Sequence, residues 1–501
     1  MQSVADGAGL AVLDVFVIVA VMSGVTWLGH YFSGAINTRT GFFQADGSLP
    51  WWAVSASILA TLVSAVTFVS VPAAVFAPDG NLTYFQVVLG LALGKIAVGL
   101  MLAKPFYLSQ GVSTSYEYIG RRLDAPTGEA SMYLGLVLTV INSGVKLLTA
   151  SLVLDVITDW GLPGCALFVV AVSVLWSALA GIKTVIWTDF LLFVLFGAGA
   201  VFALAFIALN VEQSIGEALL LLDRQAKLVL FDFSTDPGRS YTIWAGVIGG
   251  IALNIAQGST QGTWQRVRSC RSAGEAIKAY NFAALFYVMH LVILAVGLGL
   301  AVFYAEHGLP PEVGASLVEA PDRIFPHFIL TEIPVGLSGL FIAAIFAAAI
   351  STLDSALAES ADLSLTHIYA RFVRPGDSEE HYLLVSRLLM VAWGLVFLGV
   401  SLFFARYSAE GLLNLTFKLP NYIYGAIFGC IVLARIGVGR WQTILIGVVV
   451  ALSLVVWMSL QGIAFFYWCP LAGTAMVLVV YGLEHTFRGG VRAEWSGVTC
   501  E

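Results

Sequence analysis

Two adjacent hydroxyl side chains, Ser351 and Thr352, stand in the middle of a long apolar segment, after an alanine-rich stretch. Na+ is a hard cation that prefers several oxygen ligands, the general preference of Mg2+ and Ca2+. Carbonyls freed at a helix break supply further oxygens, and irregular backbone is tolerated at membrane depth only where it is buried or lines a cavity. The pair therefore fits an uncharged site for one monovalent cation. The alternative is that both hydroxyls bond back to carbonyls of their own helix.

Four charged residues also stand inside apolar segments: Lys95, Lys146, Asp189 and Asp354. A charge at such a place is costly unless it is paired, so it marks a functional site or an ion pair. Asp354 allows three interpretations: a second cation site with Asp189, a titratable carboxyl that brings proton coupling, or a salt bridge. The two lysines lie too deep to reach a membrane surface. Either they pair with carboxylates or they contact an anionic solute.

Other kinds of chemistry lack their motifs. The sequence contains no GxSxG, Walker A or HExxH pattern, and its five cysteines and seven histidines have no ligand spacing. We therefore expect no enzyme activity and no cofactor, with Na+ as the only metal ion. The net charge of −7 and the absence of a basic arm argue against a nucleic-acid partner.

The composition identifies the elements that must position these residues. Of the 501 residues, 59% are hydrophobic and 11% charged, whereas a soluble domain is about 45–50% apolar and about 25% charged. This excludes a water-soluble enzyme. Because a spanning helix needs about 20 apolar residues, the sequence predicts an all-α polytopic membrane protein with about thirteen transmembrane helices. The predicted spans are 10–32, 52–77, 83–104, 130–157, 163–181, 184–210, 242–263, 279–305, 334–366, 385–405, 410–434, 441–461 and 463–484.

The loops between these spans predict an orientation. Lys and Arg concentrate in the alternate loops that include Arg121, Arg122 and Arg266, whereas the segments 211–241 and 306–333 are long and acid-rich. Positive charge marks the cytoplasmic side, so we expect the N-terminus outside and the C-terminus inside the plasma (inner) membrane. Part of 211–241, Ile215 to Leu222, is expected to form a short surface helix.

Two of the spans are unusually rich in polar and small residues. The spans 52–77 and 242–263 carry many Ser, Thr and Gly residues, and each begins a block of five predicted helices. Paired interrupted helices at matching positions are typical of inverted-repeat transporters with a site near the membrane midplane. The alternative is that small polar residues only let helices pack closely in lipid.

The wording of several segments resembles the sodium:solute symporter family, in the branch of iodide, multivitamin and monocarboxylate carriers. The resemblance extends over about residues 48 to 370. The matching segments are SLPWWAVSASILATLVSAVTFVSVPA (48–73), STSYEYIGRRL (113–123), VIWTD (185–189), YTIWAGVIGG (241–250), TQGTWQR (260–266), DRIFPHFI (322–329) and AAAISTLDSAL (347–357).

This resemblance implies a leucine-transporter-type fold with two inverted five-helix repeats. It implies a sodium site made by carbonyls of Ala60 and Val63 with Ala348, Ser351 and Thr352. It also implies a possible second cation site at Asp189, Asp354 and Ser355, although the family usually has a second hydroxyl where Asp354 stands. Solute would bind beside the helix breaks, which gives the candidates Ser64, Thr67, Gln86, Gln257, Thr260 and Gln261.

The expected function is Na+-coupled symport of a small solute by alternating access, with proton coupling through Asp354 or a channel or sensor on the same bundle as alternatives. The partners are the solute, Na+ and the lipid bilayer, and no obligate protein partner is indicated. The expected organisation is an extra N-terminal helix and loop (1–50), a first repeat (51–210), an extracellular loop (211–241), a second repeat (242–434) and two C-terminal helices with a short tail (435–501).

Overall fold

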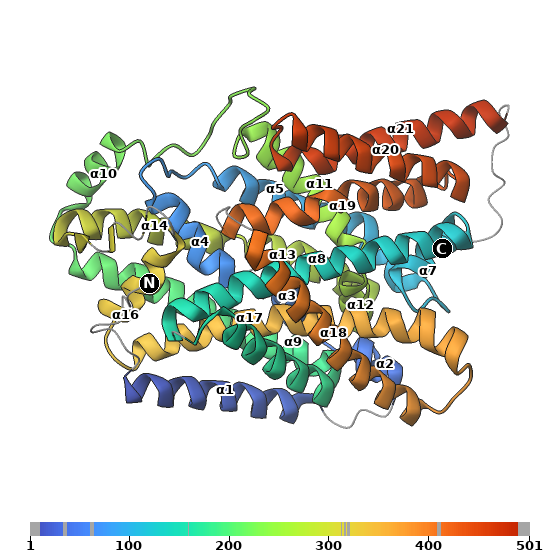
Figure 1. The fold of residues 1–501 in the computed structure, drawn as a ribbon, viewed down its shortest axis with the longest axis horizontal. Helices are drawn as coiled ribbons and strands as arrows, with labels where there is room; N and C mark the ends of the chain where they lie inside the picture. The colour runs from blue at the N-terminus through green and yellow to red at the C-terminus, as the bar shows by residue number, and fades with distance from the viewer. Residues whose placement is uncertain are drawn as a thin grey trace.

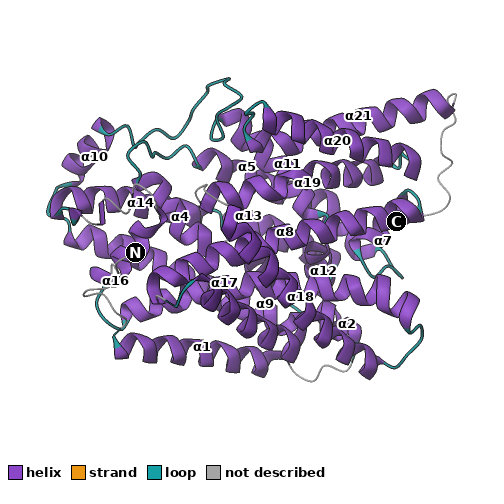
Figure 2. Cartoon of the chain, in the orientation of Figure 1, coloured by secondary structure: helices purple, strands orange, loops and turns teal. Residues whose placement is uncertain are grey.

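The computed structural model describes residues 11–33, 38–60, 65–158, 160–311, 313–314, 317, 321–407 and 412–488. Within these ranges the chain is helical and forms no β-strand (Figure 2). The first half contains α1 (Val12–Ser33), α2 (Arg39–Gln44), η1 (Ala45–Gly47), α3 (Trp51–Ala60), α4 (Ala65–Phe76), α5 (Phe85–Val98), η2 (Gly99–Ala103), α6 (Lys104–Leu108), α7 (Ser115–Arg122), α8 (Ala125–Thr158), α9 (Leu162–Asn210) and α10 (Ile215–Arg224).

The second half begins after the loop that follows α10. It contains η3 (Trp244–Ile248), α11 (Gly249–Gly258), α12 (Gln261–Ser269), α13 (Ala273–Leu285), α14 (Val288–His307), η4 (Pro321–Arg323), α16 (Ile324–Thr331), α17 (Leu337–Ser364), η5 (Leu365–Val373), α18 (Glu379–Tyr407), α19 (Leu412–Ile436), α20 (Trp441–Leu460), η6 (Phe465–Tyr467) and α21 (Trp468–Arg488). The surface helix expected at 215–222 is therefore confirmed as α10.

Among the described residues, nine helices are long and apolar enough to cross a membrane. Four shorter apolar helices accompany them: Val12–Leu28, Trp51–Ala60, Val66–Phe76 and Leu162–Ala178. Figure 1 shows the long helices running in roughly one direction, with α10 at one end of the bundle and α2 and α7 at the other. This confirms a multi-pass, all-helical membrane protein.

The two spans expected to be interrupted are described to different extents. In the span 52–77 the structure describes α3 up to Ala60 and α4 from Ala65, while residues 61–64 lie outside the described residues. The span 242–263 breaks after Gly258, where Thr260 has an extended backbone (φ −75°, ψ 164°) and α12 starts. Hydroxyl groups satisfy the carbonyls freed there: Ser259 donates to Ala256 O (2.7 Å) and Thr260 to Gln257 O (2.9 Å).

A further interruption of a helix lies where the sequence predicts two separate spans, 163–181 and 184–210. Within α9 the backbone of Gly181 has φ 61° and ψ −172°, a conformation that residues with a Cβ rarely adopt. A Cβ at Gly181 would lie 2.7 Å from the carbonyl oxygen of Phe42. Glycine is therefore needed both for the turn of the chain and for its close approach to α2.

The core of the bundle is built around α17, which packs against α1, α8, α9 and α18. Nearly all of its residues from Ser338 to Ser364 are buried. At another contact, α5 and α11 approach at backbone distance, because Gly90 faces Gly246 and Gly250, and a Cβ at Gly90 would lie 2.4 Å from Gly246 O. Small residues permit such close helix packing in membranes.

Charged side chains cap two helices at the end of the bundle that carries α10. Asp14 of α1 accepts hydrogen bonds from the backbone N–H groups of Gly336 (2.7 Å) and Gly339 (2.9 Å) and so caps the N-terminus of α17. Lys227 donates to the carbonyls of Val75, Phe76 and Ala77 at 2.7–3.0 Å and so caps the C-terminus of α4. Both signs of charge complement the helix dipole. Burial lowers the pKa of the Lys227 ammonium.

Candidate functional site

A small cavity lies where α3 ends against α17. Ala60, the last residue of α3, lines it together with Ala348 and Ser351 of α17. Leu192, Phe193 and Phe196 of α9 form the rest of its wall. The fold thus brings together three of the five residues expected to bind Na+, while Val63 and Ser64 lie outside the described residues.

The two hydroxyls singled out in α17 both act as hydrogen-bond donors. Ser351 Oγ donates to the Asp189 carboxylate, and Thr352 Oγ1 donates to Ala348 O at 3.0 Å. A hydroxyl has one proton and two lone pairs. Because each proton is already donated, the oxygen lone pairs remain available to a cation. Thr352 also lines a second, larger cavity.

Asp189 takes part in a buried ion pair with Arg266 of α12. The guanidinium Nη2 lies 3.5 Å from the Asp189 carboxylate, and the side chains are 0% and 4% exposed. Ser57 donates to the same carboxylate (2.5 Å), and Arg266 donates to Ser57 Oγ (3.1 Å) and Ser355 Oγ (2.8 Å). The guanidinium therefore contacts two of the three residues expected to form a second cation site.

Asp354, the third of those residues, is 1% exposed and lies on α17 near Ser173 and Ser177 of α9. Its carboxylate is close enough to Asp189 for the two negative charges to repel each other. The two acidic residues thus lie near each other, and Arg266 forms an ion pair with Asp189.

The larger cavity, called here the main cavity, has a volume of about 110 Å³. It is lined by residues from α3, α5, α8, α11, α12, α13, α17 and α19. Four charged groups face it: Lys95, Lys146, Arg266 and Glu359. Its other polar lining comes from hydroxyl and amide side chains: Thr139, Asn142, Ser143, Gln257, Thr260, Thr263, Tyr280, Thr352, Ser355 and Tyr424.

Three candidate solute residues line cavities. Gln257 and Thr260, on either side of the α11–α12 break, line the main cavity. Thr67 lines a neighbouring cavity of about 60 Å³ that shares Lys146 and Gln257 with the main cavity. The polar spans thus converge on one region from different parts of the sequence.

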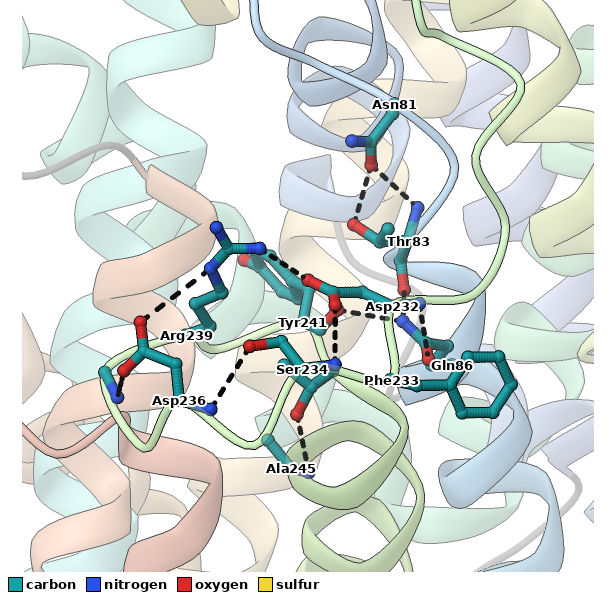
Figure 3. A network of polar contacts seen from close by, with 12 residues as sticks. Asn81, Thr83, Gln86, Asp232, Phe233, Ser234, Asp236, Arg239, Tyr241 and Ala245 are labelled. Carbon is teal, nitrogen blue, oxygen red and sulfur yellow. Dashed lines mark hydrogen bonds and ion pairs between the residues drawn. The ribbon is translucent and has the colours of Figure 1, made fainter.

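Gln86 lies in a different environment, against the loop that follows α10. Its amide donates to Tyr241 O (2.8 Å) and Thr83 O (3.2 Å) and accepts from the backbone N–H of Asp232 (3.2 Å). Figure 3 shows this network joining the start of α5 to the loop. The contacts of Gln86 therefore position the loop.

Gln261 belongs to a buried network at the start of α12. Its side chain donates to Asp362 (2.7 Å) and accepts from the backbone N–H of Ser115 (3.0 Å), while its own N–H donates to Glu359 (3.1 Å). Gln265 donates to the same Asp362 oxygen (2.9 Å). These bonds join α7, α12 and α17.

The sequence interpretation missed two tyrosines of the main cavity, Tyr280 and Tyr424, because nothing in their local sequence distinguishes them from core aromatics. The position of Glu359 on the main cavity could have been predicted from the spacing of the sequence. Thr352, Ser355 and Glu359 stand at positions i, i+3 and i+7 of one helix and therefore share a face. All three line the main cavity.

Comparisons with known proteins identify the family of the chain. A family model described as "SSF: Sodium:solute symporter family" matches residues 42–464. The chain is 28% identical to the sodium/sialic acid symporter SiaT of Proteus mirabilis, over 76% of this chain and 75% of that protein. It is 25% identical to the sodium-coupled monocarboxylate transporter 2 of Bos taurus, over 87% of this chain and 70% of that protein.

Solved structures show the same fold. A structure of a Na+-coupled sialic acid symporter in a substrate-bound, outward-open state aligns with a TM-score of 0.82 and 23% identity, over 95% of this chain and 98% of that one. The nucleobase-cation-symport-1 family transporter MHP1 aligns with a TM-score of 0.54 and 15% identity, over 91% of this chain and 97% of that one. The helical bundle is therefore that of known transporters.

Proposed function

The chain belongs to the sodium:solute symporter family and is a Na+-coupled symporter that works by alternating access, not an enzyme, and from this premise we propose where Na+ and the solute bind. The sequence interpretation of the family and of Na+-coupled transport is confirmed. The proposals below concern the residues, the number of ions and the topology.

We propose that Na+ binds at the small cavity, with carbonyl oxygens of Ala60, Val63 and Ala348 and the hydroxyls of Ser351 and Thr352 as ligands. The observation that carries this proposal is the meeting of the end of α3 with Ala348 and Ser351 around one cavity. In this proposal the carbonyl oxygen of Ala60, the last described residue of α3, has no partner within that helix and is available to a cation. Five neutral oxygens suit a monovalent ion.

Solute binds in the main cavity in this proposal, beside Gln257 and Thr260, with Thr67 toward the neighbouring cavity. Ser64 remains a candidate that lies outside the described residues. Thr352 belongs to the proposed sodium site and also lines the main cavity. Ion and solute then share α17, so each stabilises the conformation that the other needs. Gln86 and Gln261 act as supports, because their amides are engaged by backbone groups and by Asp362.

We propose that the second cation position is filled by Arg266 in this conformation, so that one Na+ accompanies each solute. The support is the contact of its guanidinium with Asp189 and Ser355. A second Na+ at Asp189, Asp354 and Ser355 requires a conformation in which Arg266 has moved. Proton coupling through Asp354 is the second candidate, favoured by the burial of this carboxyl beside Asp189.

The finer architecture is also a proposal. We propose thirteen spans in a leucine-transporter-type arrangement, with inverted repeats at 51–210 and 242–434, and with the N-terminus outside and the C-terminus in the cytoplasm. The break between α11 and α12, together with the matching polar span 52–77 of the sequence, supports the repeats. Arg39, Arg121 and Arg122 on α2 and α7, at the bundle end opposite α10 (Figure 1), support the orientation.

The experiment that tests the sodium site uses purified protein in proteoliposomes and in detergent. NaCl is expected to raise Tm relative to KCl at equal ionic strength, and an inward Na+ gradient is expected to drive counterflow of a transported solute where a pH gradient does not. Equal responses to Na+ and K+ would contradict the site, and drive by a pH gradient alone would favour Asp354.

A further inference from the structure

We propose that the short helix α7 closes the main cavity on the side of the membrane where α7 lies. In this proposal Tyr116 is a plug beside the cavity, and Gln261 is a positioning residue that holds α7 closed. The inference rests on the proposed function, in which the main cavity holds the solute, and it adds the element that must move to release the solute. Alternating access requires such an element at each end of the bundle, because the site opens to one side at a time.

The first step is the position of Tyr116. Its side chain is 0% exposed, although α7 lies at the end of the bundle opposite α10 (Figure 1). Its hydroxyl is close enough to interact electrostatically with Glu359 and Tyr424, which line the main cavity, and with Cys430 of α19. A Cβ at Gly135 of α8 would overlap the same hydroxyl. Tyr116 therefore lies between the main cavity and the end of the bundle that carries α7.

The second step is the state of the Tyr116 hydroxyl. It is buried and has no hydrogen-bond partner among the described residues, whereas buried polar groups are normally paired. Leaving such a group unpaired costs free energy in the closed conformation. Water can pair with the hydroxyl once α7 moves away, so the unpaired hydroxyl favours opening. Other bonds must therefore hold α7 in place.

The third step is the set of bonds that hold the start of α7. The amide oxygen of Gln261 accepts the backbone N–H of Ser115 at 3.0 Å, and its amide nitrogen donates to Asp362 of α17 at 2.7 Å. One buried amide thus joins the first residue of α7 to both α12 and α17. The hydroxyl of Thr114, which caps α7, is also hydrogen-bonded to His367 at 2.9 Å. These bonds oppose the opening.

The fourth step is the attachment of the other end of α7. Gly120 and Gly128 of α8 approach at backbone distance, since a Cβ at Gly128 would lie 2.8 Å from the Cα of Gly120. Arg122 donates to the carbonyl oxygen of Ala434 at 3.2 Å. The end of α7 thus stays attached to α8 and α19 when the bonds at its start are released. The helix can then rotate about the contact between the two glycines, and Tyr116, in its first turn, leaves the cavity wall.

The test uses Cys430 as a native reporter, because this thiol is 1% exposed and lies near Tyr116. The full-length protein with Cys500→Ser is placed in vesicles and treated with a membrane-impermeant methanethiosulfonate reagent. Tyr116→Ala and Gln261→Leu should each raise the labelling rate by at least about tenfold, and Cys430→Ser should abolish the signal. Ala125→Cys, at the exposed first residue of α8, marks the side of the membrane from which the reagent should reach Cys430.

Two matched controls separate a gate from a general loosening of the fold. Tyr118→Ala removes the second buried tyrosine of α7, which packs on Phe106 of α6 with 5.1 Å between the ring centroids. It should leave the labelling of Cys430 unchanged. Asp362→Asn keeps one oxygen that can accept the hydrogen bond from Gln261, so labelling should stay slow. Asp362→Leu removes this acceptor, so labelling should become fast.

Three outcomes would overturn the inference: an equal acceleration in Tyr118→Ala, labelling of Cys430 only from the side opposite α7, or unchanged labelling in both Tyr116→Ala and Gln261→Leu. If Tyr116→Ala fails to fold, the contrast between Asp362→Asn and Asp362→Leu still decides. Labelling requires neither Na+ nor solute, so its failure refutes the gate alone. Absence of any Na+ effect on the Tm of the unmodified protein refutes the proposed sodium site alone.

Discussion

Thr352→Ala is the cleanest perturbation of the proposed sodium site. The hydroxyl of Thr352 makes one hydrogen bond in the described structure, to Ala348 O at 3.0 Å, within the continuous helix α17. Loss of this bond within a helix has a small cost, so the main consequence of the substitution is one missing ion ligand. Ser351→Ala is less clean, because it also removes a donor to Asp189.

The magnitude follows from the proposed ligand count. Removal of one of five neutral oxygen ligands is comparable to loss of a hydrogen bond to a charged group, about 1.5–3 kcal/mol. Since about 1.4 kcal/mol corresponds to a tenfold change in affinity, the Kd for Na+ is expected to rise by about 10- to 100-fold. Stabilisation by a ligand follows its concentration relative to Kd, so the Na+ titration of Tm should shift by the same factor.

The assay is a titration of NaCl against Tm, with choline chloride added to keep the ionic strength constant. It needs no knowledge of the solute. Thr352→Ser keeps the oxygen and is the matched control, for which the midpoint should stay within about threefold of the original. An unchanged Na+ midpoint in both Thr352→Ala and Ser351→Ala would refute the placement of the site.

Three further predictions concern buried charged residues. Asp189→Asn and Arg266→Met should each destabilise the protein by about 3–5 kcal/mol, because each leaves a buried charge unpaired. The double variant should lose less free energy of unfolding than the sum of the two single losses. Strictly additive losses in denaturation measurements would argue against the ion pair. Asp354→Ser should leave a Na+-driven carrier, as counterflow under Na+ or pH gradients will show, and loss of a pH-driven component would support proton coupling. Lys227→Met should lower the free energy of unfolding by about 1–3 kcal/mol, because three carbonyls at the end of α4 lose their donor. Arg224→Met on the adjacent surface helix is the control. An equal loss of stability in both variants would contradict a capping role for Lys227.

The membrane architecture was largely predictable, because a run of apolar residues needs no tertiary partner to make it a spanning helix. The spans 385–405 and 441–461 correspond closely to α18 and α20. The interruption at 242–263 was also readable from its Gly, Ser and Thr content, and it lies at Ser259 and Thr260. Hydroxyls at a break can replace the lost helix partners, which is why such residues mark it.

The pairing of the buried charges was harder to predict. The sequence interpretation offered carboxylates as partners for the lysines and placed Arg266 among the basic residues of the cytoplasmic loops. In the structure Arg266 faces inward and contacts Asp189, which lies 77 positions earlier in the chain. No local pattern encodes a contact between α9 and α12, because it depends on how α17 packs against both.

Composition and apolar runs were sufficient to indicate a membrane bundle, the wording of several segments resembled one family, and the Ser351–Thr352 pair predicted a monovalent-cation site. These features are local, since each follows from residue type or from spacing along one helix. The tertiary structure decided which charges meet. It places Asp189 beside Arg266, sets Lys95 and Lys146 on one cavity wall, and turns Gln86 to the loop after α10. Charges act through space at distances unrelated to sequence separation. The set of charged side chains that line the main cavity is therefore decided only by how α5, α8, α12 and α17 pack together.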